Sequence, residues 1–536
     1  MKFCLVIIAF LISFPAALLS QVPVPADTSK VDSVSGPITD TLLIPTEEKR
    51  LADIQERLKE FQKSEKPTPR FSFYDSLLTY LVSERFNHRS QIDQSFFHDA
   101  GDYFRFDPSY VVMDYQSTPM RKTVQPFGLI GNRLNVISNG VPFTPFEHTV
   151  EPDGMMDLND IPTALDGSVY IIPGAMGTLF GGESNIATIL SVSSSADSNK
   201  PASSIMADKG YFGYAFVRGK YARKFSNNRK IELSASSRKS DGVEFGRGDE
   251  QLHYTGSFFV PVKQRFGIGV DAKIYDRDAA LVIRPDSGGA LINRHRFDRS
   301  LRTSFEIQNK SYSARSEFGF RHLRQGSEIN GAYYGRFDNT VNGIFFSHEK
   351  MVGSKVIKAE LTTDFSDYDN GQNESHRFNS SLSFVLASLK KVHNFSLSAK
   401  ANYSDDYDFL PSTALIYKSD FDKLFVQLSL GFAQIEPMQH QLYLPFRQSS
   451  LYGSTVKEYS ESGNAQLKKE SQLVGNLTLE AGTKGNHLAI QITGGRITDA
   501  IVWTMTRQSG AIEVLHFSPV NNDLTFSTIT VKPRLQ

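Results

Sequence analysis

Apolar and polar residues alternate in short runs from about residue 200 to the end of the chain. The apolar positions recur at every second residue in 266–274, 378–386, 395–403, 424–430 and 488–492. Successive side chains of a β-strand point to opposite faces, so a period of two gives each strand one apolar face. Runs of about 9–11 residues of this kind fit tilted strands that cross a bilayer. The pattern predicts an antiparallel transmembrane β-barrel over residues 201–536.

The connections between these runs differ in length. Short polar turns stand at Lys263-Gln264 and Lys390-Lys391, whereas longer polar inserts such as 364–376 are expected to form outer loops. A soluble β-sandwich or propeller would alternate as well, because one face of each sheet packs on a partner. No blade-length repeat is evident, and the alternation of long loops with short turns favours the barrel.

A compact, turn-rich segment precedes the alternating strands. Between residues 128 and 195, β-prone runs at 134–137, 169–172 and 186–192 are separated by glycine, asparagine and proline, which allow tight turns. The turn positions that we single out are Asn139, Gly140, Pro173, Gly174, Gly181 and Gly182. A small sheet directly before a barrel suggests a plugged outer-membrane pore. The expected fold is mainly β, with a small mixed α/β plug domain at residues 89–200 followed by the barrel.

The N-terminus has the features of a secretory signal. Met1 and Lys2 provide a positive start, residues 3–19 are mostly apolar, and small residues lead to a cleavage site near Ser20. An uncleaved anchor is the alternative, although the apolar run is at the short end for a membrane span. We expect a signal peptide at residues 1–20.

Polar residues dominate residues 21–45, which we expect to be disordered. This segment contains one brief apolar patch, formed by Asp40, Thr41, Leu42, Leu43 and Ile44. Such a patch can add as a strand to the sheet of a partner, although an incidental apolar cluster explains it equally well. Residues 46–88 hold two amphipathic helical patterns separated by a Lys-Pro-Thr-Pro break, and we expect a periplasmic helical segment there.

Composition excludes several other functions. The 58 Lys and Arg residues balance the 58 Asp and Glu residues, so the chain has no net charge that would attract nucleic acid. The single cysteine, Cys4, would leave with the signal peptide, which excludes disulfides and thiol chemistry in the mature chain. The motifs of hydrolases, nucleotide-binding loops and zinc proteases do not occur, and the histidines are scattered without ligand spacing.

A calcium loop was the remaining metal hypothesis. Residues 366–371 resemble part of such a loop, but their acidic residues fall at the wrong positions, and Arg377 occupies the place of the closing glutamate. A solvated surface loop is the better interpretation. We therefore expect no enzyme, no catalytic residues, no cofactor, no metal site and no nucleic-acid partner.

Four stretches in residues 132–192 occur in an order that is typical of one family. They are NRLNVISNGVPF (132–143), MDLNDIP (156–162), VYIIPGAMGTLFGG (169–182) and ATILSV (187–192). In this order they resemble the plug domain of TonB-dependent outer-membrane receptors. Two barrel stretches resemble motifs of the same family, and they are LGFAQIEPMQHQLYL (430–444) and GNAQLKKESQLVGNLTLEAG (463–482).

The resemblance implies a location and partners for a divergent member of this family. The mature chain would lie in the outer membrane of a Gram-negative-type cell, surrounded by outer-membrane lipid. Residues 40–44 would be the TonB box, the strand on which a TonB-type energising complex pulls. The ligand would be a small molecule of the siderophore, cobalamin, glycan or peptide class.

The plug departs from the family at its charged positions. Pro126-Phe127-Gly128 stands where the family has Ile-Arg-Gly, Ile172-Pro173-Gly174 stands where it has Arg-Gly-Pro, and Gly167-Ser168 replaces an acidic pair. In the family these charges help to seat the plug against barrel carboxylates. We therefore expect a plug without the usual ion pairs, which is held by packing or is not gated by TonB.

The barrel is short for the family. From about residue 203 there is room for about 14–16 strands, whereas barrels of this family close with about 22. Either the barrel is smaller or the chain is truncated at its C-terminus. We favour truncation, in which case the unclosed sheet would leave a strand edge that lipid does not tolerate.

These observations support one functional hypothesis over two others. We expect an outer-membrane TonB-dependent receptor that takes up an unidentified ligand through a plugged barrel. The first alternative is a passive or degenerate plugged barrel that acts as a porin or a surface-binding scaffold. The second is an exported soluble β-rich binding protein.

Overall fold

The computed structural model describes most of residues 99–534. Short segments within this range are not described, namely 105–106, 115–121, 132, 139–140, 144–156, 162–165, 185, 194–200, 226–228, 243–247, 264, 283–290, 310–312, 332–334, 391, 422, 445–446, 452–456, 483–486 and 510–512. The expected signal peptide, the candidate TonB box at 40–44 and the helical segment 46–88 lie outside the described residues, as do Asn139 and Gly140. No helix of the described part is long and apolar enough to cross a membrane.

In the described residues, two small sheets and three short 3₁₀ helices make up the N-terminal part, which we call the plug. Its elements are η1 (Ala100–Phe104), β1 (Tyr110–Asp114), β2 (Lys122–Pro126), β3 (Leu134–Ser138), β4 (Val141–Phe143), η2 (Leu158–Asp160), β5 (Asp166–Pro173), η3 (Gly174–Phe180) and β6 (Ala187–Ser193). Strands β1 and β2 form a hairpin, and the other four pair in the order β4-β3-β6-β5 with β3 and β6 parallel. The three β-prone runs predicted from the sequence correspond to β3, β5 and β6.

Long antiparallel strands form the second part, which we call the wall. They are β7 (Ala202–Lys209), β8 (Ala215–Lys224), β9 (Lys230–Ser240), β10 (Asp249–Lys263), β11 (Phe266–Val282), β12 (Leu291–Gln308), β13 (Ala314–Gly331), β14 (Gly335–Val352), β15 (Lys355–Asp369), β16 (Glu374–Ser388), β17 (His393–Ser404), β18 (Asp408–Phe421), β19 (Leu424–Ile435), β22 (Glu470–Gly482), β23 (His487–Gln508) and β24 (Glu513–Arg534). These are sixteen strands of the described residues, within the range expected from the sequence. A short helix, α5 (Gln439–Tyr443), and the strands β20 (Arg447–Leu451) and β21 (Lys457–Glu461) lie between β19 and β22.

Side chains alternate between the two faces of the wall as the period of two predicts. On β12, Leu301 and Phe305 are 40% and 53% exposed and point away from the plug, whereas Arg294, Arg296 and Asp298 at the alternate positions are buried. An apolar outer face and a polar inner face are the pattern of a transmembrane barrel. The apolar face of the wall is therefore the face that would contact lipid.

One sequence expectation about the outer loops is wrong. Residues 364–376 were expected to form a long loop, but β15 continues to Asp369, β16 begins at Glu374, and only residues 370–373 connect them. Strands of such barrels extend beyond the lipid, where the outward side chains need not be apolar. The polar residues that suggested a loop, such as Asp367 and His376, form a pair across these extended strands.

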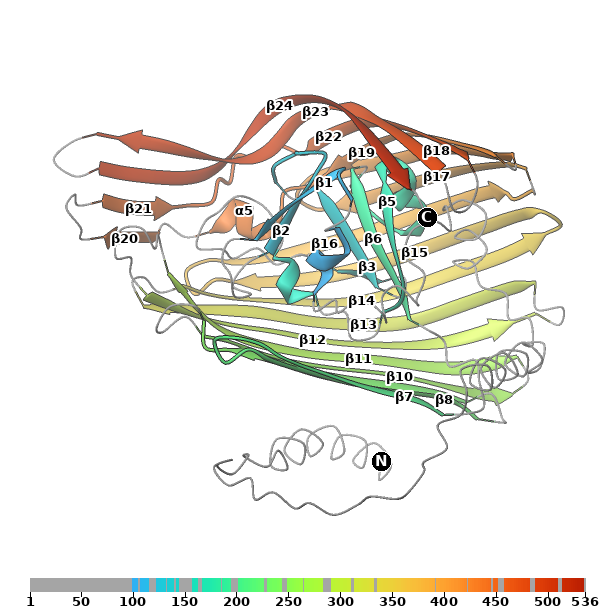
Figure 1. Ribbon diagram of the computed structural model, residues 1–536, viewed down its shortest axis with the longest axis horizontal. Coiled ribbons are helices and arrows are strands. Elements are labelled where there is room, and N and C mark those ends of the chain that lie inside the picture. The colour runs from blue at the N-terminus through green and yellow to red at the C-terminus, as the bar shows by residue number, and fades with distance from the viewer. Residues whose placement is uncertain are drawn as a thin grey trace, which may run out of the picture. The chain divides into compact units, whose positions relative to one another are not determined.

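The strand order is that of a barrel, but the sheet is not closed at one seam. Neighbouring strands pair continuously from β7 to β19 and on through β22 and β23 to β24. Among the described residues, no strand register joins β24 to β7, so the seam between them stays open. Figure 1 shows β24 along the upper edge of the wall and β7 along its lower edge, with the plug strands between them.

Candidate functional site: the plug and its seat on the wall

Glycines bracket the short helix with which the plug meets the wall. Pro173 ends β5, and Gly174 begins η3 with a φ of +67° while its amide donates a hydrogen bond to the carbonyl oxygen of Ile186. A Cβ on Gly174 would also lie 3.0 Å from the Cβ of Asn476 on the wall, so a larger residue would have to displace its neighbours. Gly181 caps the C-terminal end of η3 in the left-handed region. The Pro-Gly and Gly-Gly turns thus fix a seven-residue helix against β22.

Helix η3 packs into an apolar site on the inner face of the wall. Met176, Leu179 and Phe180 of η3 are each 1% exposed. They belong to one buried cluster with wall residues Val356, Val385, Ala387, Leu389, Ala414 and Ile416. The hydroxyl groups of Thr178 and Ser398 lie 2.9 Å apart at the edge of this contact. Packing therefore holds one side of the plug to β15–β18.

A buried ion pair joins the plug to the other side of the wall. The Arg133 guanidinium donates hydrogen bonds of 2.6 and 2.8 Å to the two carboxylate oxygens of Glu470, and both side chains are almost fully buried. Glu470 also accepts hydrogen bonds from the backbone amide of Ile501 and from the Gln472 side chain. Charge-assisted, multiply bonded contacts of this kind are strong and directional.

The plug carboxylate Asp157 makes a second ionic contact with the wall. Its Oδ2 accepts hydrogen bonds from Arg277 at 2.9 Å and from Arg294 at 3.4 Å. Its Oδ1 accepts from the backbone amides of Lys122 and Asn159, at the N-terminal cap of η2. Local backbone geometry thus orients this carboxylate toward two wall arginines.

Three charged residues form a buried triad within the plug. The Lys122 ammonium lies 2.8 Å from the Asp99 carboxylate and 2.9 Å from the Asp102 carboxylate. Burial raises the pKa of Asp99 above its ordinary value even though Lys122 opposes the shift. Burial alone would lower the pKa of Lys122, but Asp99 and Asp102 together raise it above 10.5. The ammonium therefore stays charged at neutral pH and compensates the two carboxylates.

The plug lacks the usual ion pairs, but it is not held by packing alone, because other ion pairs join it to the wall. The positions at which the family carries plug charges are Pro, Gly and Ser in this chain, as the sequence shows. The structure places the charges elsewhere, at Arg133, Asp157, Lys122 and Asp99. Arg133 and Asp157 lie in two of the plug stretches quoted above, but their wall partners are distant in sequence. The plug is seated by both packing and buried ion pairs.

A group of hydrogen-bonded side chains lies around α5. Arg377 donates hydrogen bonds to Asp406 and to the carbonyl oxygen of Pro437, and Asn370 donates to the carbonyl oxygen of Tyr443. Burial raises the pKa of the nearby Tyr407 to about 12, so its hydroxyl stays protonated and donates to the carbonyl oxygen of Leu467. Arg377, the residue that argued against a calcium loop, thus holds two connections of the wall together.

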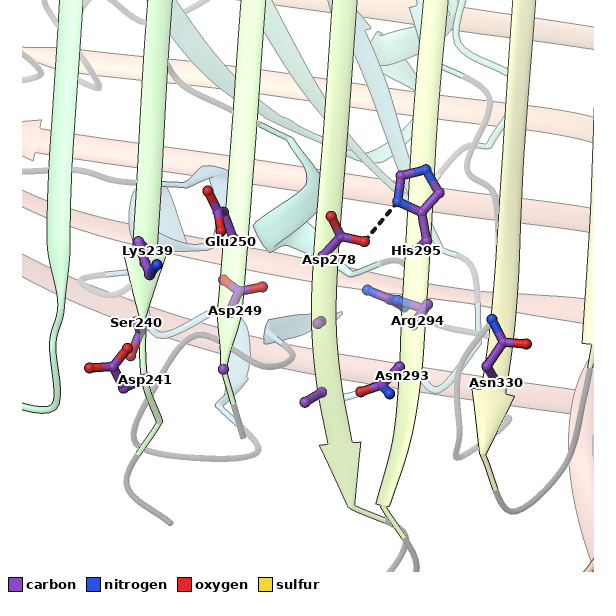
Figure 2. Close-up of a pocket in the computed structure, with 13 residues that line it drawn as sticks. Lys239, Ser240, Asp241, Asp249, Glu250, Asp278, Asn293, Arg294, His295 and Asn330 are labelled. Atoms are coloured by element: carbon purple, nitrogen blue, oxygen red, sulfur yellow. Dashed lines mark hydrogen bonds and ion pairs between the residues drawn. The ribbon is translucent and has the colours of Figure 1, made fainter. Parts of the chain in front are cut away.

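A pocket of about 410 Å³ opens beside the Asp157 contact, at the ends of β9–β13. Figure 2 shows Arg294 on β12 and Asp249 on β10 among its lining residues, with a hydrogen bond between His295 and Asp278. In the part of the chain that the structure describes, no three His, Cys, Asp or Glu side chains are grouped so that they could hold a metal ion.

Comparisons with known proteins agree on the fold. No protein-family model matches the sequence, and no curated protein is similar to it. Among solved structures, the siderophore receptor PirA from Acinetobacter baumannii matches with a TM-score of 0.64 at 9% identity, over 86% of this chain and 78% of that chain. PirA from Pseudomonas aeruginosa matches with a TM-score of 0.59 at 11% identity, over 81% and 85%. The copper transporter OprC matches with a TM-score of 0.62 at 13% identity, over 81% and 73%. The chain therefore has the plugged β-barrel fold of the TonB-dependent siderophore and copper receptors.

Proposed function

We propose that this protein is an outer-membrane receptor that takes up a small ligand through its plugged barrel, energised by a TonB-type complex that pulls on residues 40–44. One observation carries the proposal: a plug seated on the inner face of a wall whose outer face is apolar. The likeness to siderophore and copper receptors supports the same role. In this proposal residues 1–20 are removed on export, 89–200 form the plug, and 201–536 form the barrel in outer-membrane lipid.

Four classes of small molecule are candidates for the ligand. The neighbours named above are described as siderophore receptors and as a copper transporter, which makes a metal chelate one candidate. Cobalamin, glycans and peptides are the others, because the same fold hosts different specificities in its loops.

Deleting residues 40–44 is expected to abolish ligand accumulation, because the energising complex would lose the strand that it grasps. Cells that produce this chain as their only such receptor would be given labelled ferric siderophores, cobalamin and oligosaccharides, with and without a protonophore. A matched deletion of residues 31–35, in the same polar segment, should leave accumulation unchanged.

Two outcomes would contradict the proposal. Accumulation that survives both the deletion and the protonophore would indicate a passive plugged barrel. Recovery of the chain in the soluble periplasmic fraction, without heat-modifiable migration in detergent, would indicate a soluble binding protein.

A further inference from the structure

Four arginines lie together on the inner face of β9–β12. The strand registers place Arg238 and Arg277 on either side of Gln251 and place Arg296 opposite Arg277, so the three form one row across four strands. Arg294 lies two residues along β12 from Arg296, on the same face. All four side chains are nearly fully buried, and neighbouring strands are only about 4.8 Å apart. We call these four residues the arginine seat.

Carboxylates from both the wall and the plug compensate the arginine seat. On the wall, Asp249 bonds Arg277 at 2.6 Å and Arg238 at 3.2 Å. From the plug, Asp157 contacts Arg277 and Arg294, and Asp99 approaches Arg238 at 3.9 Å. Buried like charges are tolerated only while such partners are present. If the plug left the wall, the seat would lose two of the carboxylates that contact it.

The pocket reaches the arginine seat through one of its four residues, Arg294, at the ends of β9–β13. Arg294 lines the pocket (Figure 2). Its guanidinium also donates a hydrogen bond of 3.4 Å to Asp157 of the plug. Asp249 lines the same pocket. The other carboxylates of the lining are those of Asp241, Glu250 and Asp278, and all three residues are exposed; Glu250 and Asp278 occupy the alternate positions of β10 and β11. The inner face of the pocket is therefore the face that carries the arginines.

We propose that the arginine seat is an anion-binding site for the carboxylate or phosphate group of the ligand, and that Asp157 fills this site while the receptor rests. The inference rests on the proposed function, since it names the ligand chemistry of the same plugged barrel. Guanidinium groups recognise carboxylate and phosphate through the same paired hydrogen bonds. An arriving anion engages Arg294 first, replaces the Asp157 carboxylate, and weakens the hold of the wall on the η2 edge of the plug, where Gln251 also donates a hydrogen bond to the carbonyl oxygen of Asn159.

This exchange explains why an anion is required. Withdrawing Asp157 without a replacement leaves Arg277 and Arg294 buried with one carboxylate fewer, which is strongly unfavourable. Exchanging one carboxylate for another anion keeps the charges compensated. The edge of the plug at Asp157 therefore opens readily only for a ligand that brings its own negative group.

Asp157→Asn is expected to uncover the site. Calorimetric titration of the purified full-length protein with pyrophosphate should show binding about tenfold tighter than in the wild type, because the probe no longer competes with the plug carboxylate. The double variant Asp157→Asn/Arg294→Gln should lose this gain. Arg133→Gln, which loosens the plug at its other ionic contact, serves as the matched control and should show no gain.

A second measurement uses the unaltered chain and so does not depend on how the variants fold. Pyrophosphate should speed amide hydrogen exchange in residues 157–161 of the wild type, whereas sodium chloride of equal ionic strength should not. Unchanged affinity in Asp157→Asn, an equal gain in Arg133→Gln, or equal exchange with both salts would overturn the inference. None of these measurements depends on ligand uptake. The proposed function is tested separately, by the deletion of residues 40–44.

Discussion

Replacing Glu470 by alanine is expected to free the plug strand that follows Arg133. The carboxylate of Glu470 is bonded by Arg133, by Gln472 and by the amide of Ile501, and it is buried. Removing one partner of a buried pair leaves the other charge uncompensated, at a cost of about 3–5 kcal/mol. Hydrogen exchange in β3 should rise accordingly. The fluorescence of Trp503, the only tryptophan, should change at lower urea because it lies two residues from Ile501.

The matched control for this prediction is Asp523→Asn. Asp523 pairs with Arg496 on the neighbouring strands β23 and β24, but both side chains are more than half exposed. Exposed pairs contribute little, so β3 exchange should stay at the wild-type rate. Equal rates of hydrogen exchange in β3 of the Glu470→Ala and Asp523→Asn variants would show that the Arg133–Glu470 contact does not hold the plug to the wall.

Replacing Lys122 by methionine is expected to destabilise the plug strongly at neutral pH and less in acid. The variant buries the Asp99 and Asp102 carboxylates without the Lys122 ammonium and leaves Arg238 at 3.9 Å from Asp99, which costs about 3–5 kcal/mol in the free energy of plug unfolding. Burial already raises the pKa of Asp99 in the folded protein. The folded state is therefore favoured at low pH, and it loses stability as the pH rises through that raised pKa. Protonation in acid should therefore restore part of the loss in the variant.

Lys122 of the wild type contributes to stability in the same direction but in a much higher pH range. The folded-state pKa of Lys122 is raised above 10.5, so its stabilising contribution is complete below that pH and is lost only as the pH rises through the raised value. Urea unfolding of the plug at several pH values checks both trends. Lys532→Met, at a more exposed plug–wall pair with Asp107, should cost less. If the free energy of unfolding lost in Lys122→Met is as large in acid as at neutral pH, the two buried carboxylates are not its cause.

The sequence predicted the fold because the signals of the fold are local. The period of two predicted the wall strands, and the Pro-Gly and Gly-Gly turns predicted the short strands of the plug and the break around η3. The sequence did not predict that β15 extends to Asp369 and that β16 begins at Glu374. Strand ends that lie beyond the lipid do not need apolar residues at every second position, so the period of two is lost there. His376 and Asp367 are paired there as neighbours in a sheet, which polarity alone does not show.

The seat of the plug was not predictable in the same way. Arg133 and Glu470 are 337 residues apart, and Asp157 and Arg277 are 120 residues apart. Each of these residues looks like an ordinary polar position in its own segment. Comparison with the charged positions of the family suggested that the ion pairs were missing, because this chain carries them at other positions. Only the strand registers bring the partners together.

Helix η3 rests on the inner face of the wall, and the central claim of the proposed function is that this part of the plug leaves the wall before ligand passes. It is tested most directly by the double variant Thr178→Cys/Ser398→Cys, since the two hydroxyl groups lie 2.9 Å apart and Cys4 is the only native cysteine. A disulfide should form in isolated outer membranes, and accumulation of ligand should stop until the bond is reduced. Absence of the cross-link, or undiminished accumulation by the fully cross-linked protein, would contradict this claim.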